Sequence, residues 1–408
     1  MRLDYLIRLF IREGFELHLS STEEHGSYSA FYEDLERVYR HSIDSNSSET
    51  SAKLAQINPD IVIFDRYPTE EQFSWLVMKA CPKAIRILDT EDLHGLRRAR
   101  QLTLEELENR GYLTHLYVAK HEVKTKSVYN TIALREMVSM HRSDLSLLVS
   151  DVELSYAQKY YGIPPNQLLY QPILSSRPVG QFSPLNNDTR THVCFIGNFK
   201  HAPNRDAVHF LQYQLWPHIN EALRGQGNKN CECHIYGAYM DAKMKRLNNP
   251  SIIGFHMKGR VDDVFSTVEA YRVLLAPLRF GAGVKGKILD AISMELPIVT
   301  TPIGGEGLSV YLDGVDFPGH VAKTIEEFKH SAVQYLSALA LSRWEFPAQK
   351  VELKERLDIE YGIRCVDHVN KMLQRKNSIM NPIKVMLEQN SQLAHRNLSK
   401  YIQLKNEG

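Results

Sequence analysis

The chain has 408 residues, which exceeds the ~250–300 residues at which a single hydrophobic core usually stops growing, so two domains are expected. Apolar residues make up 43% and charged residues 24%, a composition that excludes wholesale disorder. The 49 Lys and Arg residues nearly balance the 48 Asp and Glu residues, which argues against binding of nucleic acid through a broad basic surface.

The cysteine content and the hydropathy pattern favour a reduced, cytoplasmic protein. Five cysteines do not make a disulfide framework, and Cys231 and Cys233 form a C-x-C pair with no second pair at zinc-site spacing. No apolar run approaches the ~18–20 residues that span a bilayer. Charged residues interrupt the start of the chain, so it does not resemble a signal peptide. We therefore expect a cytoplasmic chain without a transmembrane segment, whose membrane contacts would be peripheral.

The first part of the chain alternates between helical and strand patterns. Apolar residues from Leu3 to Ile11 recur at helical spacing, Gly14 follows as a C-terminal cap, and the alternation after it predicts a strand. Ser150, with Glu153 three residues later, predicts a capping box at the start of a helix that ends near Gly162. Further strands are predicted at 61–64, 85–88 and 145–149, and helical patterns at 69–80 and 102–141. This order indicates an α/β domain with a parallel sheet.

A second alternating region follows a stretch rich in Pro, Ser, Asn and Gln, which predicts an interdomain linker. The expected organisation is an N-terminal domain at 1–171, the linker at 172–190, a C-terminal domain at 191–375 and a polar tail at 376–408. The tail has an amphipathic helical pattern at 383–402. Strands of the C-terminal domain are predicted at 193–196, 234–236, 252–255, 273–276 and 297–300. Two such domains favour a ligand site in a cleft between them.

Residues 276–291 carry the strongest chemical signal. Three glycines and two lysines lie between a buried strand and the start of a helix: Gly281, Gly283, Gly286, Lys285 and Lys287. Glycines let backbone N–H groups approach a ligand, and a helix N-terminus attracts negative charge. With the lysines, this describes a diphosphate cradle without an obligatory metal. Asp290, one turn into the helix, is placed to accept from a ribose hydroxyl. A tight β–α turn with exposed lysines is the alternative interpretation.

Three segments resemble the group 1 family of retaining, nucleotide-sugar-dependent glycosyltransferases with the GT-B fold. Residues 276–308 (APLRFGAGVKGKILDAISMELPIVTTPIGGEGL) are similar to the donor-binding segment of the family, and residues 195–211 (FIGNFKHAPNRDAVHFL) to the first strand–loop–helix of its C-terminal domain. Residues 143–154 (SDLSLLVSDVEL) resemble the end of its N-terminal domain. The resemblance implies an α/β fold of two Rossmann-like domains facing each other across a cleft. It also implies a nucleotide sugar as co-substrate, with no further cofactor and no metal.

The resemblance assigns expected roles to individual residues. His94 follows a buried strand, where parallel-sheet enzymes place functional loops, and it matches a histidine that faces the donor sugar. Asp290 matches the second glutamate of the family, which contacts the donor ribose, so His94 and Asp290 are the expected catalytic residues. The expected donor-binding residues are Gly197, Asn198, Gly281, Gly283, Lys285, Lys287 and Asp290. Four further polar residues are candidates to support them: Asp89, Asp92, Arg97 and Glu306.

The sequence departs from the family at three places. Ala282 replaces the first glutamate, which contacts donor-sugar hydroxyls, and a backbone amide near Gly281 to Gly283 would take over part of that role. Asn198 stands where the family often has a phosphate-binding arginine, so the diphosphate charge falls to Lys285 and Lys287. The first strand and glycine-rich loop of the family precede the helix with which this chain opens. A misassigned start, a genuine short form and another segment that fills the gap are the three explanations, of which we favour the first, a truncated gene model. We therefore expect no strand before residue 14 and a gap in the N-terminal sheet.

These patterns favour one function over two alternatives. The leading function is transfer of a sugar from a nucleotide sugar to a hydroxyl acceptor with retention of anomeric configuration. The acceptor would be a glycan, a lipid-linked oligosaccharide or a small molecule, and no nucleic-acid partner is expected. The second hypothesis is a non-catalytic glycosyltransferase-like protein that binds a nucleotide sugar or acts as a scaffold. Ala282 and the missing strand favour it. Another GT-B enzyme, such as a nucleotide-sugar epimerase, is the third.

Overall fold

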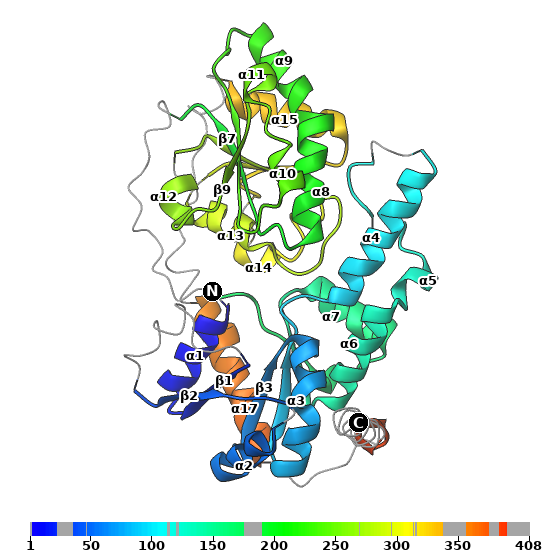
Figure 1. Ribbon diagram of the computed structural model, residues 1–408, viewed down its shortest axis with the longest axis vertical. Helices are drawn as coiled ribbons and strands as arrows, with labels where there is room; N and C mark the ends of the chain where they lie inside the picture. Colours follow the sequence, from blue (N-terminus) through cyan, green and yellow to red (C-terminus); the bar gives the residue numbers. More distant parts are fainter. Residues whose placement is uncertain are drawn as a thin grey trace, which may run out of the picture. The chain divides into compact units, whose positions relative to one another are not determined.

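The structure is a computed structural model that describes residues 2–22, 36–45, 47–111, 115–119, 122–174, 190–268, 270–294, 296–312, 314, 316–337, 356–374 and 383–389. The chain forms two compact units (Figure 1). The first unit comprises residues 1–93, 134–177 and 354–408, and the second comprises residues 94–133 and 178–353. Each unit is therefore assembled from segments that are separated in the sequence.

The first unit contains a four-stranded parallel sheet. Its strands, in spatial order, are β3 (Ile61–Asp65), β4 (Ile85–Asp89), β5 (Leu145–Leu148) and β6 (Leu168–Tyr170). β4 and β5 are buried along their whole length, as is usual for parallel strands covered on both faces. The helical elements described around it are α1 (Arg2–Arg12), α2 (Ser48–Ile57), α3 (Arg66–Ala80), α6 (Thr131–Arg142), α7 (Asp151–Tyr156), η3 (Ala157–Tyr161), η4 (Pro165–Gln167), η8 (Asp358–Ile363) and α17 (Arg364–Gln374).

The sheet of this unit is in two pieces among the described residues. β1 (Leu17–Ser21) pairs in parallel with β2 (Val38–Ser42), and this pair is separate from the four-stranded sheet. Residues 2–14 form α1 and a turn that ends at Gly14, where φ is +87°. They contain no strand. The expected absence of a strand before residue 14 is confirmed for residues 2–14, whereas the expected gap in the sheet stays a prediction.

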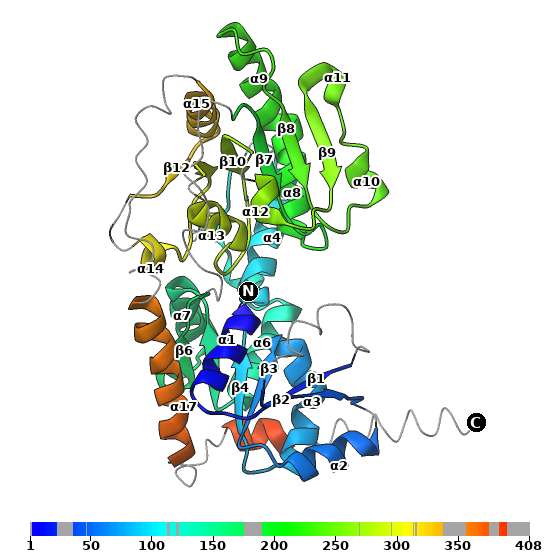
Figure 2. The ribbon, with the colours of Figure 1, turned by 90° about the vertical axis from the view of Figure 1, so that its left-hand side faces the viewer.

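Polar contacts hold α1 against distant parts of the same unit. The buried Arg2 guanidinium donates to both carboxylate oxygens of Asp89 at the end of β4 (2.8 and 3.0 Å) and to the carbonyl oxygen of Gln171 (2.6 Å). Tyr5 donates from its hydroxyl to the Asp358 carboxylate, and Arg12 Nη1 donates to the same carboxylate (2.7 Å). Figure 2 shows α17, drawn in orange, continuing from this contact along the unit. Residues near the C-terminal end of the chain therefore pack against its first helix within the first unit.

The polar tail also contributes to this unit. Residues 383–389 are helical, and Glu388 accepts a hydrogen bond from Arg86 Nη2 (2.5 Å). Lys384 donates to the carboxylate of Asp144, which also accepts from the backbone N–H of Arg86 (2.9 Å). These ion pairs join the start of the predicted tail helix to β4 and to the residue before β5. The remainder of the predicted helix, 390–402, lies outside the described residues.

The second unit contains a six-stranded parallel sheet with the order β12-β11-β10-β7-β8-β9. The strands are β7 (Val193–Ile196), β8 (Cys233–Tyr236), β9 (Phe255–Gly259), β10 (Val273–Ala276), β11 (Ile298–Thr300) and β12 (Gly319–Val321). In Figure 1, α8 and α9 lie along one side of this sheet and α12 on the other. The helical elements described are α4 (His94–Asn109), α5 (Thr125–Val128), α8 (Ala202–Phe210), η6 (Leu211–Leu215), α9 (Trp216–Gly225), α10 (Ala242–Lys245), α11 (Pro250–Ile253), α12 (Val264–Val268), α13 (Gly286–Ser293), α14 (Ser309–Leu312) and α15 (Ile325–Leu336).

The main core of the second unit lies between this sheet and helices α8, α9 and α15. Phe195 of β7, Phe255 of β9 and Phe328 of α15 are almost completely buried in it. Trp216 opens α9 and is fully buried, and its ring N–H donates to the Ile253 carbonyl oxygen (2.6 Å). An indole N–H without a hydrogen-bond partner is costly to bury, and this hydrogen bond provides the partner.

The structure corrects several sequence-based expectations. The strand predicted at 252–255 is wrong, because α11 spans Pro250–Ile253 and is capped by Gly254, where φ is +60°, and β9 begins only at Phe255. The capping box at Ser150 is also wrong in part. The Ser150 hydroxyl accepts from the Val152 N–H (3.2 Å), but the Glu153 carboxylate accepts from the Leu93 N–H (2.7 Å) instead. Three short strands were not expected from the pattern: β2, β6 and β12.

The cysteines agree with the sequence-based expectation. All five are free and buried, and burial raises the pKa of the Cys231 thiol to about 12. Such thiols are un-ionised at neutral pH and unreactive. Within the described part of the chain, no helix has the length and apolar character that crossing a bilayer requires.

Candidate functional site

The strand order of the second unit defines where a ligand site is expected. β7 and β10 are neighbours at the centre of the sheet, and the chain leaves them in opposite directions, toward β8 and β11. Such a reversal leaves an opening beyond the carboxyl ends of the two strands, and ligands of open parallel sheets bind there. The loops that follow β7 and β10 contain Gly197 and Asn198, and Gly281 to Lys287, respectively. Both predicted donor-binding loops therefore lie at the same edge of the sheet.

An arginine of α4 binds the glycine-rich loop after β10 and also forms an ion pair with a glutamate. Arg100 of α4 donates through Nη1 to the carbonyl oxygen of Gly281 (2.6 Å). Its two terminal nitrogens also donate to the two carboxylate oxygens of Glu306, both at 2.7 Å. The Arg100 side chain is 3% exposed and the Glu306 side chain 12%. Glu306 therefore positions the loop through Arg100, and Gly283 within the loop has a φ of +64° that favours glycine.

A second arginine holds the segment just before this loop. Arg279 donates through Nε to the Asp206 carboxylate of α8 (2.9 Å) and through Nη1 to the Glu108 carboxylate of α4 (2.7 Å). Its side chain is 7% exposed, so these are buried, charge-assisted contacts. The Val118 N–H donates to the Arg279 carbonyl oxygen (2.8 Å). Helix α4 is thereby built into the second unit beside the glycine-rich loop.

The two lysines of the loop differ in their surroundings. Lys285 donates from Nζ to the carbonyl oxygens of Ala282 (3.1 Å) and Gly283 (2.6 Å), which folds it back onto the loop. Lys287 lies in the first turn of α13, with Nζ 3.9 Å from the centre of the Phe195 ring and 2.7 Å from Asn204 Oδ1. Burial, and next the charge of Lys285, lower the pKa of Lys287 to about 7. A site that disfavours the ammonium form in this way favours an anionic ligand that would restore it.

Asn204 joins the two loops. Its Nδ2 donates to the Asn198 carbonyl oxygen (2.8 Å), while its Oδ1 accepts from Lys287. A Cβ at Gly197 would lie 2.7 Å from Asn204 Cγ, so the loop after β7 can approach Asn204 only with glycine at that position. The Asn198 side chain accepts from the Lys200 N–H (2.8 Å). Sequence reasoning missed Asn204, although it lies within the segment 195–211 that carries the family resemblance.

The remaining predicted residues are distributed over both units. Asp290 is half-buried, one turn after Gly286, and Ala282 is buried at 6% exposure. His94 and Arg97 lie in the first turn of α4, half-buried, in the same unit as the two loops. The structure therefore places His94 at a helix start and not in the loop that the sequence predicted.

Asp89 and Asp92 belong to the first unit. Asp89 is buried and bound by Arg2, so it anchors α1. Asp92 is half-buried just after it. Between them Glu91 has a φ of +59°, uncommon for a residue with a Cβ, and burial followed by the charge of Asp89 raises the pKa of its carboxyl group. Sequence reasoning did not single out Glu91, because a left-handed backbone leaves no composition signal.

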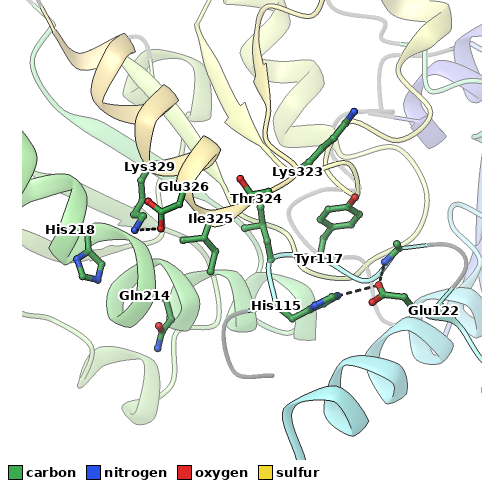
Figure 3. A pocket seen from close by; sticks show the side chains of 12 residues that line it. His115, Tyr117, Glu122, Gln214, His218, Lys323, Thr324, Ile325, Glu326 and Lys329 are labelled. Atoms are coloured by element: carbon green, nitrogen blue, oxygen red, sulfur yellow. Dashed lines mark hydrogen bonds and ion pairs between the residues drawn. The ribbon is translucent and has the colours of Figure 1, made fainter. Parts of the chain in front are cut away.

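A pocket of about 610 Å³ opens elsewhere in the second unit (Figure 3). Its walls come from residues 115–119 and Glu122, from η6 and α9, and from the start of α15. His115 contacts Glu122 (3.1 Å) on one wall, and Lys329 pairs with Glu326 (2.7 Å) on another. No residue of the loops after β7 and β10 lines it. The pocket is therefore separate from the candidate nucleotide site.

The sheet order defines an α/β protein of the doubly wound type, a fold whose ligands bind at loops placed like those after β7 and β10. Residues 190–338 match the family model of glycosyl transferases group 1, which confirms the resemblance of the two segments 195–211 and 276–308. A search of curated protein sequences found no significant match.

Solved structures confirm the GT-B fold. The chain is similar to Anabaena HepE in complex with UDP and glucose, with a TM-score of 0.55 and 11% identity over 91% of this chain and 95% of that one. It is similar to the lipopolysaccharide outer core galactosyltransferase WaaB, with a TM-score of 0.53 and 13% identity over 91% and 94% of the two chains. A TarM variant from S. aureus has a TM-score of 0.52 and 12% identity over 80% of this chain, which spans 58% of the TarM chain.

Proposed function

We propose that the protein transfers a sugar from a nucleotide-sugar donor to a hydroxyl acceptor, with retention at the anomeric carbon and without a metal at the reacting centre. The observation that carries this proposal is that the loops after β7 and β10 lie at the same edge of the sheet and are joined through Asn204 and Lys287. The match of residues 190–338 to a glycosyltransferase family supports it.

The donor diphosphate is proposed to bind at the loop from Gly281 to Gly286. Backbone N–H groups at the start of α13 and the two lysines supply the positive charge there. Lys287 is the more important lysine, because a diphosphate beside it stabilises the ammonium form that burial disfavours. As the sugar leaves the diphosphate, negative charge grows on the leaving group, and the same cations stabilise that charge. Asp290 is proposed to accept from a ribose hydroxyl.

The sugar is proposed to be oriented by His94 and by backbone N–H groups of the glycine-rich loop. Ala282 has no polar atom on its side chain, so it cannot contact sugar hydroxyls as a glutamate would. Arg100 then takes a positioning role, because it fixes the Gly281 carbonyl and with it the orientation of the following N–H groups. The acceptor class stays open among glycans, lipid-linked oligosaccharides and small molecules. The relatives WaaB, a galactosyltransferase, and HepE, seen with UDP and glucose, make UDP-hexoses the first donors to test.

A second candidate function is nucleotide-sugar binding without catalysis. Ala282 and the two-piece sheet of the first unit favour it. The two functions share the donor site and differ in product formation, since only an enzyme releases free nucleoside diphosphate together with a glycosylated acceptor. An epimerase would change the sugar without an acceptor.

A thermal-shift panel of UDP, GDP, ADP and dTDP with their common sugars tests the site. The wild type is compared with Lys285→Ala/Lys287→Ala and with the control Lys323→Ala/Lys329→Ala, which removes two lysines at the separate pocket. A nucleotide at 100-fold over its dissociation constant stabilises the wild type and the control by about 2.7 kcal/mol. The loop variant is expected to lose that shift. Equal shifts in all three proteins would overturn the proposed donor site.

A further inference from the structure

Three potential metal ligands gather on one face of the second unit's sheet, outside the proposed donor site. His234 of β8 and His256 of β9 are register partners on neighbouring parallel strands. Glu232 precedes His234 by two residues, so its side chain emerges on the same face. The candidate ligand atoms of these residues all lie within 4.8 Å of one another. Because the histidines lie near the amino ends of their strands, the cluster is at the opposite end of the sheet from the loops after β7 and β10.

The hydrogen bonding of the cluster leaves a buried nitrogen unsatisfied. The Glu232 carboxylate contacts His234 Nε2 (2.8 Å) and lies 3.3 Å from His256 Nε2. The second contact lacks hydrogen-bond geometry, and His256 Nε2 is buried with no hydrogen-bond partner among the described residues. A buried polar atom of this kind requires an explanation. It faces the carboxylate and the other imidazole, where an ion would meet all three side chains.

The residues behind the cluster resemble the support that metal-bound histidines usually have. His234 contacts the Tyr271 hydroxyl through Nδ1 (2.7 Å), and that hydroxyl also contacts the Tyr236 hydroxyl (2.7 Å). A ligating histidine commonly uses its second ring nitrogen in this way, which fixes the ring orientation. The Glu232 N–H donates to His192 Nδ1 (3.1 Å), which fixes the backbone of the carboxylate ligand.

The types of side chain in the cluster also suit a cation. Two imidazole nitrogens and one carboxylate form a ligand set that binds zinc and related first-row ions, with a further position left for water. The His234 side chain is 9% exposed, that of His256 22% and that of Glu232 38%, so an ion can enter from the Glu232 side.

We propose that Glu232, His234 and His256 form a binding site for a divalent transition-metal ion, zinc in the cell, that ties the edge strand β9 to β8. The ion replaces the contacts between Glu232 and the two histidines by coordinate bonds. Because β9 ends the sheet and its pairing with β8 is irregular beside Ile235 and Tyr236, such a cross-link stabilises the second unit at its edge.

The test uses the purified full-length protein after removal of metal with a chelator. Zn²⁺ is measured by elemental analysis after desalting, and Co²⁺ is titrated as a spectroscopic probe of coordination geometry. We expect tight binding of one equivalent in the wild type and in the control His320→Ala, which removes an exposed histidine 4.0 Å from Glu327. Glu232→Gln and His256→Gln are each expected to lose this equivalent. Tyr271→Phe keeps the ligands and is expected to weaken binding by about 10–100-fold.

The thermal unfolding temperature provides a second readout. Zn²⁺ is expected to raise it in the wild type and in His320→Ala, but not in Glu232→Gln, a variant that keeps the size of a half-exposed side chain. Unchanged stoichiometry and affinity in Glu232→Gln and His256→Gln would show adventitious binding and overturn the proposal. Absence of tight binding in folded wild-type protein would overturn it as well.

Discussion

Replacing Arg100 by methionine removes the donor that serves both Glu306 and the Gly281 carbonyl. Both groups are then left in a largely buried site, since the two charged side chains are 3% and 12% exposed. Breaking a buried pair by removing one partner costs about 3–5 kcal/mol. At about 2–4 °C per kcal/mol for a domain of this size, the unfolding temperature is expected to fall by roughly 6–20 °C.

A double variant separates the ion pair from the loop. Replacing both charges in Arg100→Met/Glu306→Leu is expected to recover much of the lost stability, because an apolar pair of similar volume is often neutral relative to a buried ion pair. Nucleotide affinity is expected to stay reduced in both variants, since the Gly281 carbonyl lacks its donor in each. Calorimetric unfolding and nucleotide titration measure the two effects. A loss below about 1 kcal/mol in Arg100→Met, or a double variant as unstable as the sum of the single ones, would refute this reasoning.

Three further predictions concern Lys287, Arg2 and Trp216. The pKa of Lys287 is lowered from 10.5 to about 7, and only the protonated form attracts a diphosphate, so UDP affinity is expected to fall as the pH rises above 7. Calorimetry in buffers of different ionisation enthalpy should show proton uptake at pH 8, and its absence would contradict the assigned role; Lys323→Ala is the control. Arg2→Met leaves Asp89 buried without its partner and is expected to lower the free energy of unfolding by about 3–5 kcal/mol. Nucleotide affinity is expected to stay unchanged in the folded protein, and a selective loss of affinity would instead assign Asp89 to the nucleotide site. Trp216→Phe removes a buried hydrogen bond and is expected to destabilise the protein by about 1–3 kcal/mol in urea unfolding, whereas an unchanged midpoint would show that the bond contributes nothing.

The sequence predicted those strands and loops that are determined by residues close together in the chain. Continuous apolar runs predicted β4, β5, β7 and β10, and glycine spacing predicted the loop before α13. The strand predicted at 252–255 failed because Pro250 starts a helical turn that apolar residues can equally well occupy.

Contacts between distant segments could not be predicted in this way. Arg100 and Glu306 are 206 residues apart, and nothing in either segment specifies the other. The cluster of Glu232, His234 and His256 depends on the register of β8 against β9, because a slip of one residue would turn His256 to the opposite face. The contacts of Asn204 with both loops depend on the pairing of β7 with β10, which the sequence does not specify.

The discontinuous composition of the first unit affects the order in which the protein can fold during synthesis. Tyr5 and Arg12 contact Asp358, a residue translated about 350 positions later, and Arg86 contacts Glu388. All segments of the second unit have been translated by residue 353. Since domains generally fold as units while the chain is being made, the second unit can be complete while the first still waits for its last helices. Chains released after residue 353 should therefore hold a protease-resistant second unit beside an unfinished first one.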